Sequence, residues 1–146
     1  MQCFAKSDRG AVRKENQDRA AGARIRRKGC VVGVVCDGMG GAAGGKLASE
    51  LAASTFLAQF RREMMAGSAV EPAMRAACDA ANQAAVALLR QRKKRPMKPF
   101  AVMMRDEQTA ARECNITPEQ LEILTGHQKP ILLLDRRENG MLCEAV

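Results

Sequence analysis

The chain has 146 residues, which suits one ordinary domain, and 47% of them are hydrophobic, enough for a modest core. Its 24 Lys and Arg outnumber 16 Asp and Glu, and this excess favours anionic partners such as phosphorylated groups, nucleotides or RNA. Six scattered cysteines without a Cys-x-x-Cys pair argue against a zinc site or a disulfide framework. Without a membrane-spanning run or a signal-peptide pattern, we expect a cytoplasmic protein and no membrane partner.

Hydrophobic periodicity and turn residues predict strands that alternate with helices. We expect strands near residues 2–6, 20–27, 30–36, 99–104 and 130–135. We expect helices near residues 43–65, 70–93, 107–114 and 117–125. The fold class is therefore α/β (α+β), with two partial sheets joined through a long helix. Such sheets leave edges that whole domains cover, so we expect marginal stability.

A polar loop at residues 7–18 follows the first predicted strand and contains Arg13 and Asp18. A guanidinium matches two phosphate oxygens, and a carboxylate supplies oxygen ligands that suit hard divalent cations. These two side chains are therefore candidates for a chemical role. A charged loop is more often solvated surface than a site, and that interpretation stays open.

The β-branched run at residues 31–36 leads directly into Asp37 and Gly38 and then into a glycine-rich turn. This arrangement places one carboxylate at the end of a buried strand, where bare backbone lets an ion or phosphate approach closely. Asp37 is therefore the first candidate for chemistry. An Asp-Gly pair also makes an ordinary turn, which is the alternative interpretation.

Two sequence blocks resemble the start of the metal-dependent protein serine/threonine phosphatases of type 2C, the PPM family. The blocks are SDRGAVRKENQD at residues 7–18 and VCDGMGG at residues 35–41, followed by Ala48 and Ser49. The resemblance covers roughly the first 75 residues and implies part of a phosphatase β-sandwich. Bacterial members usually have glutamate at the position of Lys46 and often histidine at that of Ala42, but neither is a metal ligand in the family.

This resemblance implies metal-assisted hydrolysis of phosphoserine or phosphothreonine in a protein substrate. Two Mn²⁺ or Mg²⁺ ions would be held by Asp18, Asp37 and the carbonyl of Gly38. Arg13 would hold the phosphoryl oxygens, so Arg13 and Asp37 are the expected catalytic residues. The later aspartates of the phosphatase metal centre are missing from this sequence, and we expect weak or absent activity.

A basic cluster ends the second long predicted helix and comes directly before the predicted strand at 99–104. Its members are Arg90, Arg92, Lys93, Lys94, Arg95 and Lys98. A cationic loop that leads into a buried strand suits a nucleotide or a phosphate. Most basic runs are instead solvated helix ends, and this alternative stays open.

Residues 77–146 resemble the YrdC-like nucleotide-binding domain of the hydrogenase maturation carbamoyltransferase HypF. The resemblance is concentrated in KKRPMKP at residues 93–99, and Gly126 departs from the serine usual in that family. It implies ATP-dependent adenylation of a carbamoyl donor, with Lys93, Arg95 and Lys98 binding the anionic substrate and ATP. The related threonylcarbamoyl-AMP synthases also suggest double-stranded RNA as a partner.

The two resemblances meet near residue 77 without a Gly, Ser or Pro linker, and each family is represented only in part. We therefore predict a partial phosphatase domain at residues 1–76 and a partial YrdC-like domain at 77–146. A natural fusion, a rearranged gene and an assembly artefact are all compatible with this join. The leading hypothesis is a phosphatase-type fragment. The alternatives are carbamoyl adenylation with ATP, or a remnant that binds nucleotide or double-stranded RNA.

Overall fold

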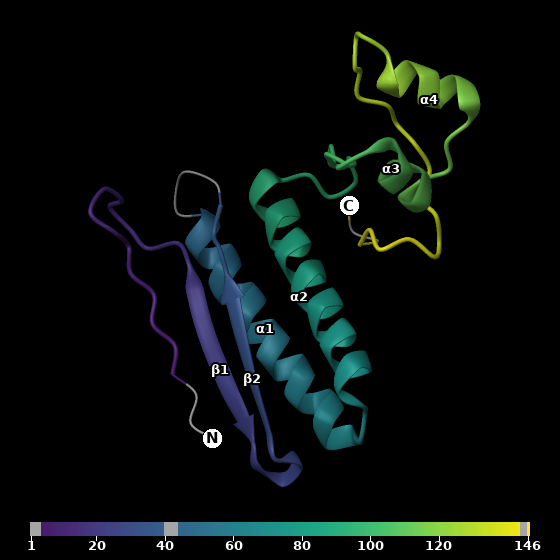
Figure 1. Ribbon diagram of the computed structural model, residues 1–146. Coiled ribbons are helices and arrows are strands. Elements are labelled where there is room, and N and C mark those ends of the chain that lie inside the picture. The colour runs from purple at the N-terminus through teal and green to yellow at the C-terminus, as the bar shows by residue number, and fades with distance from the viewer. Residues whose placement is uncertain (1–3, 40–43, 144–145) are drawn as a thin grey trace. The chain divides into compact units, whose positions relative to one another are not determined.

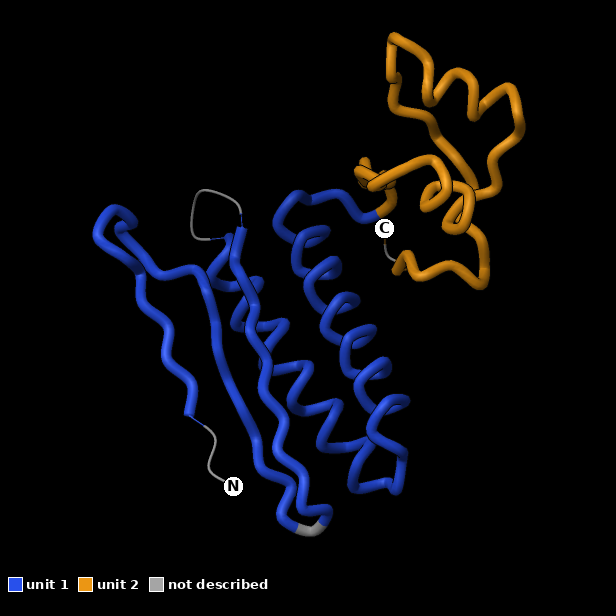
Figure 2. The backbone as a smooth tube through the Cα atoms, viewed as in Figure 1, with its two compact units in different colours: residues 1–96, 145 blue, residues 97–144, 146 orange. Residues whose placement is uncertain are grey.

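The computed structural model describes residues 4–39, 44–143 and 146, and the expected mixture of helices and strands is confirmed (Figure 1). The chain forms two compact units (Figure 2). The first contains residues 1–96 and 145, and the second contains residues 97–144 and 146.

An antiparallel hairpin begins the regular structure of the first unit. Strand β1 (Arg19–Ile25) pairs with strand β2 (Cys30–Cys36), with Arg19 opposite Cys36 and Ile25 opposite Cys30. A single 3-10 turn, η1 (Arg26–Lys28), joins them and is closed by the N–H of Gly29, which donates to the carbonyl of Arg26 at 3.1 Å. Gly29 has φ of 60°, a conformation that glycine adopts without strain.

Helix α1 (Gly44–Ala66) is the central element of the first unit, because it contacts both strands and helix α2 (Val70–Lys93). Its buried residues recur every three or four positions and form one stripe: Gly45, Ser49, Ala53, Phe56, Phe60 and Met64. The rings of Phe56 and Phe60 stack with centroids 6.2 Å apart. Ile25 and Val32 of the hairpin and Ala73 and Ala77 of α2 complete this core.

The second unit contains two short helices, α3 (Glu107–Glu113) and α4 (Pro118–Thr125). The side chain of Asp106 caps α3, and Thr117 forms a reciprocal capping box with Gln120 at the start of α4. The buried Glu113 carboxylate accepts hydrogen bonds from the N–H groups of Met141 and Leu142 at 2.6 and 2.9 Å. These bonds join the end of the chain to α3.

The strands predicted at 99–104 and 130–135 are wrong, because neither segment forms a strand. The second unit has one isolated bridge in its described residues, between Cys114 and Arg136. An extended apolar run becomes a strand only when another backbone pairs with it, and Ile131 and Leu133 remain exposed here. Of the strand predicted at 2–6, the described residues 4–6 are not a strand either, and 2–3 lie outside the described part.

The join that we expected near residue 77 lies inside α2, whereas the compact units divide after Pro96. The assignment of residues 1–76 and 77–146 to separate domains stays a prediction. In the described residues, no helix combines the length and apolar character needed to cross a lipid bilayer.

Candidate functional site

The predicted metal-binding residues lie at the end of the hairpin where β1 begins and β2 ends. Arg19 and Cys36 form the last pair of the ladder, so Asp18 directly precedes β1 and Asp37 directly follows β2. The antiparallel register therefore brings the two carboxylate-bearing positions to the same end of the sheet. That these two aspartates share one metal site stays a prediction.

Glycines let the chain pass closely beside these aspartates. Gly38 is buried, and a Cβ there would collide with the carbonyl oxygens of Gln17 and Gly45. A Cβ on Gly45 would lie only 2.7 Å from the side-chain oxygen of Gln17 and 2.9 Å from the carbonyl of Gly38. The loop before β1, the end of β2 and the start of α1 thus meet where there is no room for side chains.

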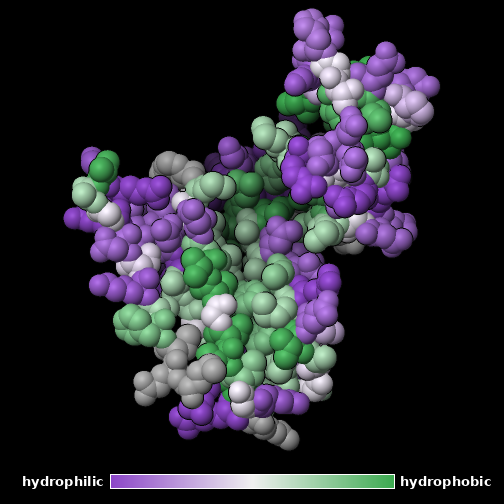
Figure 3. Space-filling view, in the orientation of Figure 1, coloured by the Kyte–Doolittle hydropathy of each residue, from purple (hydrophilic) through white to green (hydrophobic). Residues whose placement is uncertain are grey.

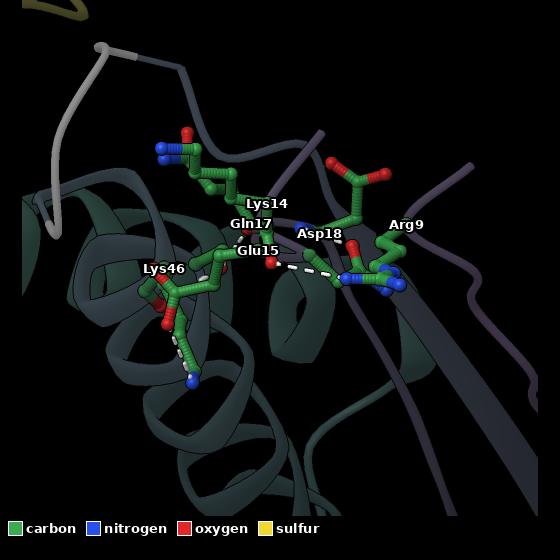
Figure 4. Close-up of polar contacts among 8 residues, drawn as sticks. Arg9, Lys14, Glu15, Gln17, Asp18 and Lys46 are labelled. Carbon is green, nitrogen blue, oxygen red and sulfur yellow. Dashed lines mark hydrogen bonds and ion pairs between the residues drawn. The ribbon is translucent and has the colours of Figure 1, made fainter. Parts of the chain in front are cut away.

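Two polar contacts hold the loop before β1 against α1. The hydroxyl of the buried Ser49 donates to the carbonyl of Gln17 at 2.6 Å and lies 2.9 Å from the carbonyl of Lys46. The ammonium of Lys46 pairs with Glu15 at 2.9 Å (Figure 4), and this hydrogen bond raises the pKa of Lys46. Lys46, which departs from the phosphatase pattern, therefore anchors the loop here.

Asp18 carries an unpaired buried oxygen. Its N–H donates to the side chain of Asn16 at 3.0 Å, which fixes the backbone, but Oδ1 of its carboxylate is buried without a hydrogen-bond partner among the described residues. The carboxylate points away from the Glu15–Lys46 pair (Figure 4). Buried polar atoms are nearly always satisfied, so an orphaned carboxylate oxygen fits a position that is completed by a cation.

The other side chains at this end of the hairpin add few ligands for a metal ion. Asp37 is exposed, and Arg13 is exposed in the loop without a hydrogen bond or ion pair to either aspartate within the described residues. Burial raises the pKa of the Cys36 thiol, which keeps it protonated at neutral pH. No group of three or more His, Cys, Asp or Glu residues within 4–39, 44–143 and 146 could hold a metal. The site therefore offers two carboxylates and a backbone carbonyl.

The basic cluster has a structural role at the carboxyl end of α2. Lys94 adopts the left-handed conformation with φ of 50° and caps the helix, and the Arg95 N–H donates to the carbonyl of Arg90 at 3.1 Å. The guanidinium of Arg90 in turn donates to the carbonyl of Arg95 at 2.9 Å. Cations at this end also interact favourably with the helix dipole. These contacts account for part of the cluster without a ligand.

The predicted nucleotide-binding residues do not belong to one compact unit. Lys93 and Arg95 lie in the first unit and Lys98 in the second, and all three are exposed. The strand that was expected to follow them is missing. The motif is therefore present in the sequence without the buried strand on which a phosphate site was expected to depend.

Sequence reasoning missed Glu15, Gln17, Gly45 and Ser49 as the residues that position the two aspartates. Glu15 and Gln17 lie inside the block at residues 7–18 and Ser49 follows the block at 35–41, but the sequence assigned no role to any of them. The usable signal was the spacing of Gly45, Ser49 and Ala53 by four, which marks a stripe of small residues on one helix face and predicts close backbone approach.

Comparisons with known proteins confirm both resemblances. Residues 75–146 match the Sua5, YciO and YrdC family, described as telomere recombination. The chain is 49% identical over 61 residues to carbamoyltransferase HypF2 of Cupriavidus necator and equally to carbamoyltransferase HypF of Rhodobacter capsulatus. Each match covers 42% of this chain and 8% of the relative.

A second set of relatives has a different name. Over 54 residues the chain is 46% identical to a Mycoplasma pneumoniae protein named "Putative protein phosphatase". This match covers 37% of the chain and 20% of the relative. No solved structure shows significant similarity to the chain. The chain thus spans only a small part of the length of each relative.

Proposed function

We propose that the first unit contains part of the metal site of a metal-dependent protein phosphatase, and that it binds Mn²⁺ or Mg²⁺ through Asp18 and Asp37. The observation that carries this proposal is the buried Oδ1 of Asp18, which has no hydrogen-bond partner and lies one residue beyond the last hairpin pair. A divalent cation would satisfy that oxygen, and the carbonyl of Gly38 would supply a third ligand.

The residues of the chain would contribute in different ways. Asp18 and Asp37 supply two negative charges. Gln17 lies close to Gly38 and Gly45 and accepts a hydrogen bond from Ser49, which keeps the loop before β1 beside the segment after β2 and the start of α1. A bound metal ion lowers the pKa of a coordinated water and polarises a phosphoryl oxygen. Arg13, from the exposed loop, would bind the phosphoryl oxygens of a phosphoserine or phosphothreonine substrate through its guanidinium.

We expect binding without efficient turnover. Two carboxylates do not hold two ions at the roughly 4 Å spacing that two-metal phosphoryl chemistry uses. The phosphatase relatives are also about five times longer than the stretch matched here. Hydrolysis of p-nitrophenyl phosphate should therefore be far below that of a complete phosphatase. Robust Mn²⁺-dependent turnover that disappears in Asp37→Asn would contradict this expectation of an incomplete site with little activity.

Calorimetric titration of the full chain with Mn²⁺ tests the binding itself. Asp18→Asn and Asp37→Asn should each weaken Mn²⁺ binding at least about tenfold, because each removes a formal charge from the coordination sphere. Asp79→Asn removes the same charge from the exposed surface of α2 and should leave the affinity unchanged. Equal Mn²⁺ affinity in all four proteins would refute the site.

The comparisons favour a second candidate function for the basic cluster. We propose that Lys93, Arg95 and Lys98 bind ATP, with a carbamoyl donor as the second substrate or double-stranded RNA as an alternative ligand. Support comes from the family match at residues 75–146 and from the two relatives named as carbamoyltransferases. The missing strand and the helix-end contacts of Arg90 make this candidate the weaker of the two.

Replacing Arg95 with lysine tests this candidate, because it keeps the charge and removes the planar fork. ATP binding should weaken in Arg95→Lys if the loop is a shaped site. Arg75→Lys is the matched control, since Arg75 is an exposed arginine of α2 outside the basic cluster and pairs with Glu71. An unchanged ATP affinity in Arg95→Lys would identify the cluster as a diffuse cationic surface.

A further inference from the structure

The hairpin has a second charged end, opposite the two aspartates. Residues 19–36 contain five Lys and Arg and no Asp or Glu. Three of these cations, Arg24, Arg26 and Lys28, are exposed at or beside the η1 turn. Figure 3 shows hydrophilic residues at this end, while hydrophobic ones gather over the middle of the first unit. Neither the metal site nor the basic cluster of α2 accounts for these cations.

The turn that carries these cations has a defined conformation. The Gly29 N–H closes η1 on the Arg26 carbonyl, and Ile25, between Arg24 and Arg26, is 96% buried in the core with Phe60 and Met64. The side chains therefore extend from a backbone that is anchored on both sides. Such anchoring lowers the entropy lost when the side chains bind a ligand.

Within the described residues, Arg24, Arg26 and Lys28 have no ion-pair partner. None of the ion pairs or side-chain hydrogen bonds found within the described residues involves Arg24, Arg26 or Lys28. Ile25 shares one core cluster with Phe60 and Met64 near the end of α1, and the exposed Arg61 follows Phe60 directly. The hairpin turn and the end of α1 lie side by side there (Figure 1). Unpaired like charges held close together favour a polyanionic partner.

We propose that this basic end of the hairpin binds the phosphate backbone of a nucleic acid. The residues that carry the site are Arg24, Arg26, Lys28 and Arg61. Three of the four are arginines, whose guanidinium forks bind phosphate oxygens bidentately. The end has no exposed aromatic side chain among its described residues, so the contacts are to phosphates and the binding is independent of base sequence.

Nucleic acid fits this end better than an anionic membrane surface does. A peripheral membrane site combines cations with apolar side chains that enter the headgroup region. The described side chains of the turn include no exposed large hydrophobic residue, although Met65 in the last turn of α1 and Val70 at the start of α2 are exposed at 49% and 54%. The turn therefore offers charge without an inserting group.

Fluorescence anisotropy of the full chain with a labelled, mixed-sequence DNA duplex tests the site. The triple variant Arg24→Gln, Arg26→Gln, Lys28→Gln should lose at least about tenfold in affinity near 0.15 M salt. The slope of log affinity against log salt should become less steep by about 2 to 3, because each lost phosphate contact contributes roughly 0.9. A scrambled duplex should bind as tightly as the original.

A charge-matched control separates a local site from overall charge. Lys6→Gln, Arg9→Gln, Lys14→Gln removes three charges from the exposed loop before β1 and should retain most of the affinity and slope. Circular dichroism of both variants checks that the helices persist. Equal losses in both variants, or no loss in the hairpin variant, would overturn the proposal. Binding to phosphatidylserine-containing vesicles but not to the duplex would also overturn it, in favour of a membrane surface.

Discussion

The hydroxyl of Ser49 on α1 donates a 2.6 Å hydrogen bond to the backbone carbonyl of Gln17, 32 residues earlier in the chain. Ser49 is only 3% exposed, so this bond fixes the loop before β1 from inside the unit. Because Asp18 follows Gln17 directly, the bond also sets where the first carboxylate of the candidate metal site lies. Ser49, which would not contact the metal ion itself, thus positions Asp18, which would bind it.

Ser49→Ala should destabilise the first unit by about 1 to 3 kcal/mol, because it leaves the Gln17 carbonyl buried without its donor. Urea denaturation followed by circular dichroism measures this loss. Mn²⁺ affinity should fall as well. Ser54→Ala is the control, since Ser54 makes an equivalent bond to its own helix, with Leu51, but is exposed. Its effect should stay within about 0.5 kcal/mol, and equal effects in both variants would contradict the prediction.

Gly38→Ala should destabilise the first unit by about 1 to 3 kcal/mol, because the new methyl group must push Gln17 and Gly45 apart. Thermal unfolding and Mn²⁺ titration should both show a loss. Gly33→Ala in β2 provides the comparison, because an added Cβ there has no neighbour within 4 Å. That variant should be neutral or slightly stabilising. A fully stable Gly38→Ala would show that the three segments do not pack this closely.

Phe60→Ala should destabilise the first unit by about 3 to 5 kcal/mol, because Phe60 is 1% exposed and stacks on Phe56. A loss of this size is comparable to the whole stability of a small unit, so the helical signal should decrease at room temperature. Phe4→Ala makes the same chemical change at a residue that is 89% exposed and should change little. A core that tolerated Phe60→Ala would contradict the assigned packing.

The stability of the first turn of α3 should depend on pH. The hydrogen bond with the Thr109 side chain, then those with the Thr109 N–H and Arg105, hold the pKa of Asp106 below its ordinary value of 3.8. Because the folded pKa is the lower one, the stabilisation is fully present above about pH 3.8 and is lost as pH falls through the folded pKa. Hydrogen exchange of the Thr109 amide should accelerate in that window beyond its intrinsic change.

The start of α4 is the internal control for this pH effect. The Gln120 amide bonds the hydroxyl of Thr117, which does not titrate but also hydrogen-bonds the Glu119 carboxylate. In Glu119→Gln, which removes that titrating partner, the protection of Gln120 should not change through loss of its cap. Asp106→Asn keeps a capping oxygen without a titrating group and should remove the pH dependence at Thr109. Identical behaviour of the Thr109 and Gln120 amides in Glu119→Gln would count against the cap.

Local patterns predicted the elements of the first unit closely. The strands expected at 20–27 and 30–36 and the helix expected at 70–93 agree with β1, β2 and α2 within about two residues. Alternation and helical periodicity depend on neighbouring residues, so one sequence suffices to detect them. The apolar runs at 99–104 and 130–135 show the limit, because a strand also needs a partner that may lie anywhere in the chain.

The sequence by itself determined the two family resemblances, the helices, the hairpin and the residue types available for chemistry. Only the tertiary structure decided that Asp18 and Asp37 share one end of the hairpin, that Asp18 has an unpaired oxygen, and that Lys93 and Lys98 lie in different compact units. The physical reason is that residue types and spacings act locally. Burial, hydrogen-bond satisfaction and proximity depend on which distant segments, such as Gln17 and Ser49, pack together.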